Sequence, residues 1–425
     1  MSLRQAATLG AAQTATTMAL SFISVKVTSV FLGPAGLGTL GQFTYFITMT
    51  QAVLAAGLNI GLVRRTAELG DDRPARERVV STVLRALVIA GIPVALVIAA
   101  SSGWLARELL HDASLGIPFV VFAALFVLGL AASVVIACAN GAKDFRTLTF
   151  INMGTAVSSL ALIVALCPPF GVLGGVLAMA LLPLASWTIA WLLARRRDWW
   201  PRRPLAHGFD AREARGIVAF VPMAVISAVG LPLLQILIRD AVAGHGGMAD
   251  VGLLQGVVRI SDMYLGVATS IFAMYYFPRF SEIADAGELV REAKRGLAII
   301  VPTVAVVSFA IWLLRDLVIR ILFTAEFNAM RDLFAWQMLG NTLKMVGWLF
   351  GYLLLAKANA LAMAALETVT IVVWWLLSLA FIAHNGTIGA PQAYAVTYAL
   401  YSVATFVGVA FVVRRMRATP RAAVA

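Results

Sequence analysis

Long apolar runs recur along this whole chain and leave little choice of fold. Of the 425 residues, 61% are hydrophobic and only 13% are charged, well outside the composition of soluble globular domains. A helix of about 20 apolar residues crosses a hydrocarbon core of roughly 30 Å. The sequence therefore predicts an all-α integral membrane protein with twelve transmembrane helices, at residues 7–32, 38–62, 79–101, 117–139, 147–167, 171–194, 214–238, 251–277, 295–314, 333–356, 361–383 and 390–413.

The chain offers few groups for catalysis or metal binding. Its two cysteines, Cys138 and Cys167, lie near ends of expected spans, and its four histidines lack ligand spacing. The longest outer connection, residues 315–332, is too short for a soluble catalytic domain. We therefore expect no enzyme, such as a glycan polymerase or a lipid-linked glycosyltransferase, and no metal or organic cofactor.

Lys and Arg are distributed unevenly among the connections. Arginines cluster in residues 64–78, after the second span, and in residues 195–215, after the sixth. Because basic connections stay on the cytoplasmic side, both termini are expected to be cytoplasmic. The formal net charge of +12 then reflects topology and contact with anionic lipid head groups, so no nucleic-acid partner is expected. Trp199 and Trp200 are expected to anchor the chain at the membrane interface.

The two halves of the chain resemble each other. Four short segments recur in the same order at similar offsets: 37–40 with 251–254, 65–68 with 279–282, 104–109 with 312–317, and 171–174 with 386–389. Six spans per half is an even number, so both halves enter the membrane in the same direction. This predicts lobes of residues 1–200 and 201–425, joined by a basic linker at 195–215, with a central cavity between them as in alternating-access carriers.

Five cations lie inside the apolar runs: Lys26, Arg85, Arg239, Arg259 and Lys344. A charge at the centre of a bilayer costs roughly 2.5–3.5 kcal/mol on insertion scales, so it needs a partner or a watery cavity. Only two acids, Asp262 and Glu367, lie at comparable depth. The excess of positive charge favours an anionic substrate.

Some of these residues also have structural interpretations. Arg259 and Asp262 are three residues apart on a helix and can neutralise each other. Arg85 lies near a span end and can extend to the surface. Arg239 lies next to Asp240 near the outer end of its span, which also allows a structural role. The tyrosines of the last span, Tyr398 among them, can pack against neighbouring helices or stack on sugar rings. Lys26 and Lys344 have no acid within one helical turn and are the strongest cavity candidates.

Several stretches resemble the Wzx-type flippases of the multidrug/oligosaccharidyl-lipid/polysaccharide (MOP) exporter superfamily. Residues 31–38 (FLGPAGLG) are similar to a signature of this family. Residues 260–265 (ISDMYL), 329–337 (AMRDLFAWQ) and 350–358 (FGYLLLAKA) resemble flippases for enterobacterial common antigen and O-antigen. The resemblance implies two six-helix lobes that move an undecaprenyl-diphosphate-linked oligosaccharide across the bacterial inner membrane. It also implies coupling to a proton or sodium gradient, and a polysaccharide polymerase and a chain-length regulator as partners.

An undecaprenyl-diphosphate-linked substrate assigns a role to each of the candidate cavity residues. The diphosphate is expected to bind Lys26, Arg239, Arg259 and Lys344, because fixed cations replace the water that phosphates lose. Asp262 and Glu367 are candidates for ion coupling or gating, and Arg64, Arg65 and Arg279 for an entry cluster. Candidate sugar contacts are Gln51, Gln255, Gln337, Asn341 and Tyr398.

Two other functions remain open from the sequence. A drug/cation antiporter of the same superfamily would carry cationic substrates and would favour an acidic cavity, the reverse of the charge balance here. A non-transporting scaffold of a polysaccharide export complex is compatible with the sequence. Transport in reconstituted vesicles would separate the last alternative from a flippase.

Overall fold

The computed structural model describes residues 3–70, 72–201, 203–205, 208–210, 221–357 and 360–418. Throughout these residues the regular structure is helical. The chain divides into two compact units, residues 1–236 and 237–425. The first part of the helix at 221–271 thus belongs to unit 1, whereas the sequence places the division at residue 200.

Unit 1 contains α1 (Leu3–Leu69), α2 (Arg73–Ala100), α3 (Ser102–Leu110), α4 (Gly116–Gly141) and α5 (Phe145–Ala194), together with the start of α7 (Val221–Ile271). Helix α4 packs against α2, α1 and α5. Phe43 and Phe46 of α1 meet Phe119 and Phe122 of α4 edge to face, with centroids 5.0–6.2 Å apart. This aromatic cluster lies in the apolar core of the unit.

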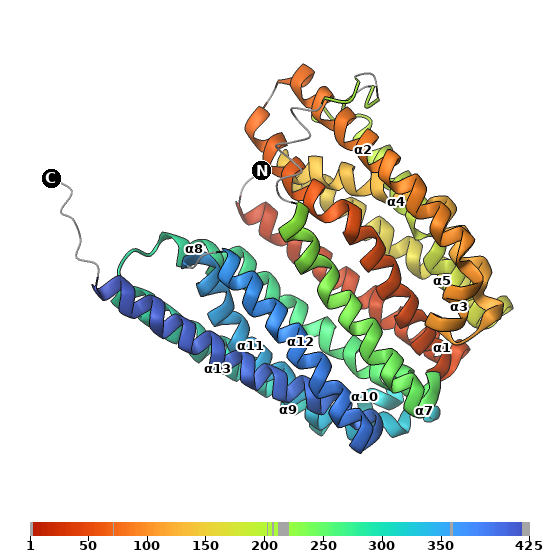
Figure 1. Cartoon of the computed structure of the whole chain (residues 1–425), viewed down its shortest axis with the longest axis vertical. Helices are drawn as coiled ribbons and strands as arrows, with labels where there is room; N and C mark the ends of the chain where they lie inside the picture. The colour runs from red at the N-terminus through yellow and green to blue at the C-terminus, as the bar shows by residue number, and fades with distance from the viewer. Residues whose placement is uncertain are drawn as a thin grey trace. The chain divides into compact units, whose positions relative to one another are not determined.

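Unit 2 contains the rest of α7, a π-helical turn (Phe272–Tyr276), α8 (Phe277–Glu282), α9 (Ala286–Leu313), α10 (Arg315–Leu322), α11 (Leu333–Lys357), α12 (Ala360–Asn385) and α13 (Gly389–Ala418). Helix α11 packs against α13 and α9, and α12 packs against α13. The three C-terminal helices, α11, α12 and α13, are drawn in shades of blue in Figure 1.

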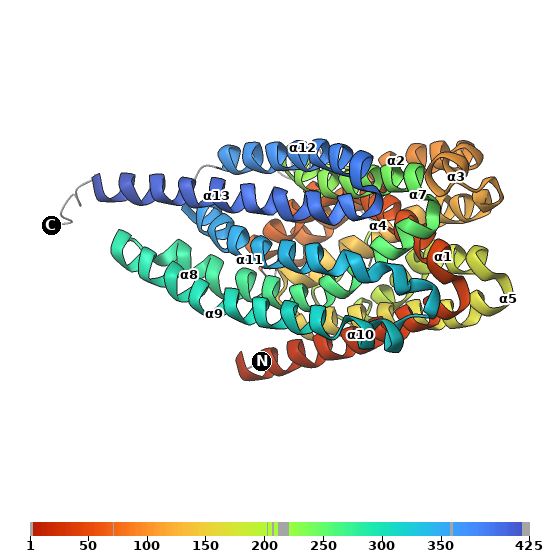
Figure 2. The same cartoon turned by 90° about the horizontal axis from the view of Figure 1, so that it is seen from below.

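In the described part of the chain, the twelve expected spans appear as eight helical stretches that are long and apolar enough to cross a membrane. Four glycines explain the difference. Four of the stretches are 50–57 residues long, twice what one crossing requires. Each contains a glycine with positive φ, at Gly33, Gly171, Gly247 and Gly386. Figure 2 shows the result for α5, whose two halves run antiparallel and join at one end. The described helices therefore agree with the predicted spans, apart from residues of the seventh span before 221, which lie outside the described part.

The internal repeat is visible in these turns. Gly33 (φ 61°, ψ −170°) and Gly247 (φ 77°, ψ −178°) share a conformation that is essentially restricted to glycine, and they occupy corresponding positions of the repeat. Gly171 and Gly386 correspond in the same way and also have positive φ. In unit 1 the turns adjoin, since a Cβ on Gly36 would lie 3.1 Å from Val172. In unit 2 the Thr387 hydroxyl donates to Asp250 beside the Gly247 turn.

Smaller details repeat as well. Helices α2 and α9 both have 28 residues. Asp72 caps the first, accepting from Ala75 N at 3.0 Å, and Asp285 caps the second, accepting from Glu288 N at 2.8 Å. Such caps satisfy backbone N–H groups that a helix start leaves without an intrahelical acceptor. The two halves of the sequence repeat are thus built from the same succession of elements.

The structure corrects one expectation about the aromatic residues beside the linker. Trp199 and Trp200 are only 9% and 6% exposed, and the Trp199 indole N–H donates to Asp144 Oδ2 at 3.0 Å. They pack inside unit 1 because Asp144, which caps α5, offers a carboxylate to the indole. They are therefore not exposed interfacial anchors.

Candidate functional site

Most of the predicted polar residues of unit 2 lie on α7, α11 and α13. Asn341 is their hub. Its amide nitrogen donates to Ser261 Oγ at 2.9 Å and to Tyr264 OH at 2.7 Å. Its amide oxygen accepts from Tyr394 OH at 2.9 Å and from Gln337 Nε2 at 3.3 Å. These four bonds use the full capacity of the amide, so Asn341 fixes α7 and α13 against α11.

Lys344 lies one turn further along α11. Its ammonium nitrogen lies 4.6 Å from the ring centroid of Trp348, 5.4 Å from Tyr398 and 5.9 Å from Tyr394. Cation–π attraction of this kind is worth about 2 kcal/mol or more when the groups are desolvated. The three rings therefore offset part of the cost of placing a cation at membrane depth, while the half-buried side chain keeps some exposed surface.

The aromatic cage of Lys344 (Trp348, Tyr394, Tyr398) is itself supported. Trp374 of α12 lies 5.3 Å from Tyr394 and 5.6 Å from Tyr398, centroid to centroid. Tyr394 also bonds Asn341, so one side chain belongs to both the cage and the hub. The position of the ammonium group is therefore determined by α11, α12 and α13 together.

One carboxylate in this unit, that of Asp262, interacts with several cations. Asp262 is exposed and interacts electrostatically with Lys344, Arg259 and Arg239. The predicted Arg259–Asp262 interaction is thus present, but Asp262 also interacts with Lys344 and Arg239. Lys344 and Arg259 already outnumber Asp262, so positive charge is in excess around this carboxylate. Glu367 is exposed on α12, where it interacts electrostatically with Tyr401.

Arg239 is fully buried, with 0% of its surface exposed. Its guanidinium donates to Gln255 Oε1 from Nε at 3.1 Å and from an Nη at 2.6 Å. The two residues lie on opposite sides of the Gly247 turn, so their contact holds the two arms of α7 together. Arg239 exposes nothing to a substrate in this structure, and Gln255 is buried with it rather than available to a sugar.

The predicted site residues of unit 1 lie on α1. Lys26 and Gln51 are both half-buried, and Gln51 packs beside Gly129 of α4 and Pro183 of α5. The structure therefore distributes the four proposed diphosphate ligands between the units: Lys26 in unit 1, and Arg239, Arg259 and Lys344 in unit 2. Their meeting in a central cavity stays a prediction.

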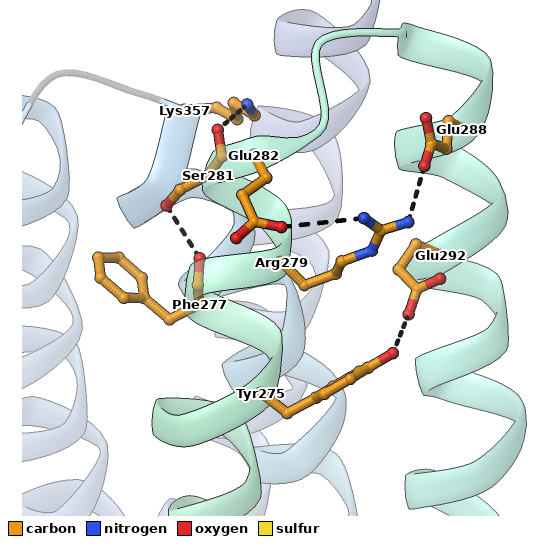
Figure 3. Close-up of polar contacts among 8 residues, drawn as sticks. All are labelled: Tyr275, Phe277, Arg279, Ser281, Glu282, Glu288, Glu292 and Lys357. Carbon is orange, nitrogen blue, oxygen red and sulfur yellow. Dashed lines mark hydrogen bonds and ion pairs between the residues drawn. The ribbon is translucent and has the colours of Figure 1, made fainter.

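The arginines of the predicted entry cluster are all engaged by glutamates. In unit 1, Arg64 and Arg65 lie 2.8 and 3.5 Å from the Glu68 carboxylate. In unit 2, Arg279 lies 2.8 Å from Glu288 and 3.9 Å from Glu282 (Figure 3). The pairs Arg65–Glu68 and Arg279–Glu282 occupy corresponding positions of the repeat. Because each arginine is paired at the surface, an incoming anion would have to compete with a carboxylate.

Sequence reasoning missed part of this site. The sequence identified Gln337, Asn341 and Lys344 as candidate site residues, but not the hydrogen bond of Tyr264 to Ser308 of α9, at 2.8 Å. The sequence analysis also did not identify the aromatic cage of Lys344. The signal for Trp348 was its position four residues after Lys344, since such residues share a helix face. The contribution of Tyr394 and Tyr398 depends on the packing of α13 against α11.

Comparison with known proteins places these observations in a family. Residues 28–332 match the profile of a family described as polysaccharide biosynthesis protein. The chain is 32% identical over 404 residues to proteins named lipid III flippase from Escherichia coli K12 and from Shigella flexneri. In both cases the match covers 94% of this chain and 96% of the relative.

The fold has solved counterparts. An inward-facing multidrug resistance MATE family transporter of the MOP superfamily superposes with a TM-score of 0.74 at 16% identity, covering 95% of this chain and 96% of that one. An outward-facing structure of such a transporter matches with a TM-score of 0.62. At this identity the likeness establishes the fold alone.

Proposed function

Because this chain belongs to the polysaccharide biosynthesis protein family and is a multi-pass membrane protein, we propose that it is a flippase for a polyprenyl-diphosphate-linked oligosaccharide. It moves the head group from the cytoplasmic to the periplasmic leaflet of the bacterial inner membrane. The full-length similarity to lipid III flippases supports the class of substrate. The observation that carries the proposal is the positively charged group around Lys344, Arg259 and Asp262.

The chemistry of the site suits a diphosphate. Only the head group needs a polar path, because the polyprenyl tail can stay in the hydrocarbon phase. Lys344 offers a point charge that its aromatic cage holds in place, and Arg259 can donate charge-assisted hydrogen bonds. Tyr394 and Tyr398 are buried, so Trp348 is the ring of the cage that keeps exposed surface for a sugar that follows the phosphates. Lys26 would add a ligand from unit 1 in an alternating-access cycle.

Two further elements belong to this proposal. Asp262 is the candidate coupling group, because a proton or sodium ion bound there would weaken its hold on Lys344 and Arg259; Glu367 is the second candidate. A polysaccharide polymerase and a chain-length regulator are the proposed partners. The common-antigen lipid intermediate is the first substrate to examine, and an O-antigen unit the second.

The proposal is tested in cells that lack their own flippase. Lys344→Ala and Lys26→Ala, inserted at normal levels, should fail to restore the surface glycan, whereas Lys344→Arg should restore part of it because the charge remains. Lys357→Ala is the matched control, since Lys357 lies at the end of the same helix and donates to the Ser281 carbonyl at 3.0 Å (Figure 3). Full restoration by both alanine variants would refute the role of these lysines.

Reconstitution separates the rival functions. Vesicles containing the purified protein and a labelled polyprenyl-diphosphate sugar should show movement of the label between leaflets, which a scaffold would not produce. An antiporter of cationic drugs would instead exchange a cation and leave the glycolipid in place. If Asp262 couples the cycle, Asp262→Asn should abolish the dependence of flipping on an imposed proton or sodium gradient.

A further inference from the structure

A second cationic site lies in unit 1, where α2 begins and α5 ends. A pocket of about 260 Å³ there is lined by five arginines against two acids, Glu77 and Asp198. The arginines are Arg73, Arg76, Arg195, Arg196 and Arg197. An adjoining pocket of about 570 Å³ shares Arg73 and Arg76 and adds Lys143. None of these residues belongs to the group around Lys344.

The carboxylates near the pocket are committed to particular arginines. Asp198 pairs with Arg73 at 2.6 Å, and Asp144 pairs with Arg197 at 3.5 Å. The three remaining arginines, Arg76, Arg195 and Arg196, face one further acid, Glu77, so positive charge is in excess at the pocket. Such an arrangement favours an anionic ligand with several oxygen acceptors.

Arg76 is the residue that most strongly favours a bound anion. Its side chain is 6% exposed and it lines both pockets. Its terminal nitrogens donate to the backbone carbonyls of Gly70 and, at 3.5 Å, Asp198. In the part of the chain that the structure describes, its Nε has no hydrogen-bond partner. A buried guanidinium that meets carbonyl dipoles in place of a carboxylate retains an uncompensated charge, which is costly.

The position of the pocket indicates the source of the anion. Trp191, near the end of the apolar α5, is exposed, and the guanidinium of Arg195 lies 5.1 Å from its ring centroid. Exposed tryptophans at span ends lie at the level of the lipid head groups. Basic pockets beside transmembrane helices at this level bind anionic lipid head groups.

We propose that this arginine pocket (Arg73, Arg76, Arg195, Arg196 and Arg197) binds the phosphate-bearing head group of an anionic membrane lipid. The phosphate oxygens accept from Arg76 and Arg196 and join the start of α2 to the segment that follows α5. The lipid is a bound structural ligand of unit 1, separate from any transported substrate. The site stands whether or not the protein is a flippase.

The test compares lipid retention by variants of the full chain. Protein purified in detergent is incubated with phosphatidylglycerol or with phosphatidylcholine, and bound lipid is counted by native mass spectrometry. We expect the wild type to retain phosphatidylglycerol in preference. Arg76→Gln and Arg196→Gln should weaken that retention at least tenfold. Arg78→Gln is the matched control, because Arg78 is exposed on α2, the helix of Arg76, and does not line either pocket.

Arg196→Gln keeps the test decisive if Arg76→Gln does not fold, since Arg196 is exposed. Equal retention by wild type and Arg196→Gln would overturn the proposal, as would an equal loss in Arg78→Gln. A parallel measurement of thermal unfolding distinguishes the source of the phosphate. If millimolar inorganic phosphate stabilises the protein as much as phosphatidylglycerol does, the pocket binds a soluble anion and the lipid assignment is wrong.

Discussion

Single polar side chains hold the helices of unit 2 in register, and Arg239 is the extreme case. A guanidinium with no exposed surface must find acceptors inside the protein, and Gln255 supplies one oxygen to two of its nitrogens. The sequence identified both residues as polar positions within apolar spans. It did not indicate that they bind each other, because the contact requires α7 to fold back at Gly247.

This contact can be tested by changing its acceptor. Gln255→Leu keeps a similar volume but removes the oxygen, so the free energy of unfolding should fall by about 1–3 kcal/mol. Gln255→Glu retains an acceptor and adds an ion pair, and it should unfold close to the wild type. The midpoint of thermal unfolding in detergent measures both. Equal midpoints for the leucine and glutamate variants would show that the hydrogen bonds contribute nothing.

The lowered pKa of Asp144 predicts that the stability of the protein depends on pH. Burial acts to raise the pKa of this carboxyl, but hydrogen bonds from Thr147 and Trp199, and the charge of Arg197, together hold it below its ordinary value. A lowered folded-state pKa contributes stability above the unfolded-state pKa of about 3.9. That contribution is lost as pH falls through the folded-state value.

Asp144→Asn should therefore be less stable than the wild type by about 1 kcal/mol at neutral pH. Asparagine is also a good helix cap, so the loss reports mainly the charge. The difference between the two midpoints should stay constant from about pH 5 to pH 8 and shrink below about pH 4. A difference that does not change with pH would mean that the carboxylate charge has no part in the effect.

At the scale of elements, the glycine turns decide which long helices become hairpins. The apolar runs predicted that the hairpins exist, since gaps near residues 33–37, 168–170, 239–250 and 384–389 separated the spans. The continuous helical stretches that result were not predictable, because each reversal is confined to one residue with positive φ. The hub of Asn341 was predictable in part, because the sequence identified Gln337 and Asn341 as polar residues within an apolar span. Its bonds to Tyr394 and Tyr264 depend on how three helices pack.

The turns are tested by adding a Cβ where space is open. Nothing lies within 4 Å of a Cβ built at Gly247 or at Gly103, so steric contact is not a factor at either site. Gly247→Ala should lower the free energy of unfolding by about 1–3 kcal/mol, because φ 77° with ψ −178° is essentially closed to L-residues. Gly103→Ala, within the helix α3, should leave it unchanged or raise it slightly. Similar values for both variants would argue against strain at the turn.

At the scale of the whole molecule, the distribution of arginines predicts its orientation. An alkaline phosphatase fused after Asp112, between α3 and α4, should be active, because that segment is expected on the periplasmic side. The same enzyme fused after Ala418, at the end of α13, should be inactive. Activities in intact cells, corrected for expression, measure the difference. Activity of the C-terminal fusion alone would reverse the proposed topology.

The matching glycine turns of the two halves also bear on ancestry. An ancestor with an even number of crossings begins and ends on the same side of the membrane. Its gene can therefore be duplicated in tandem and read as one frame, and the second copy inserts in the orientation of the first. Two halves related in this way can each take a separate role: here the first half carries the arginine pocket, and the second half carries a lysine enclosed by aromatic rings.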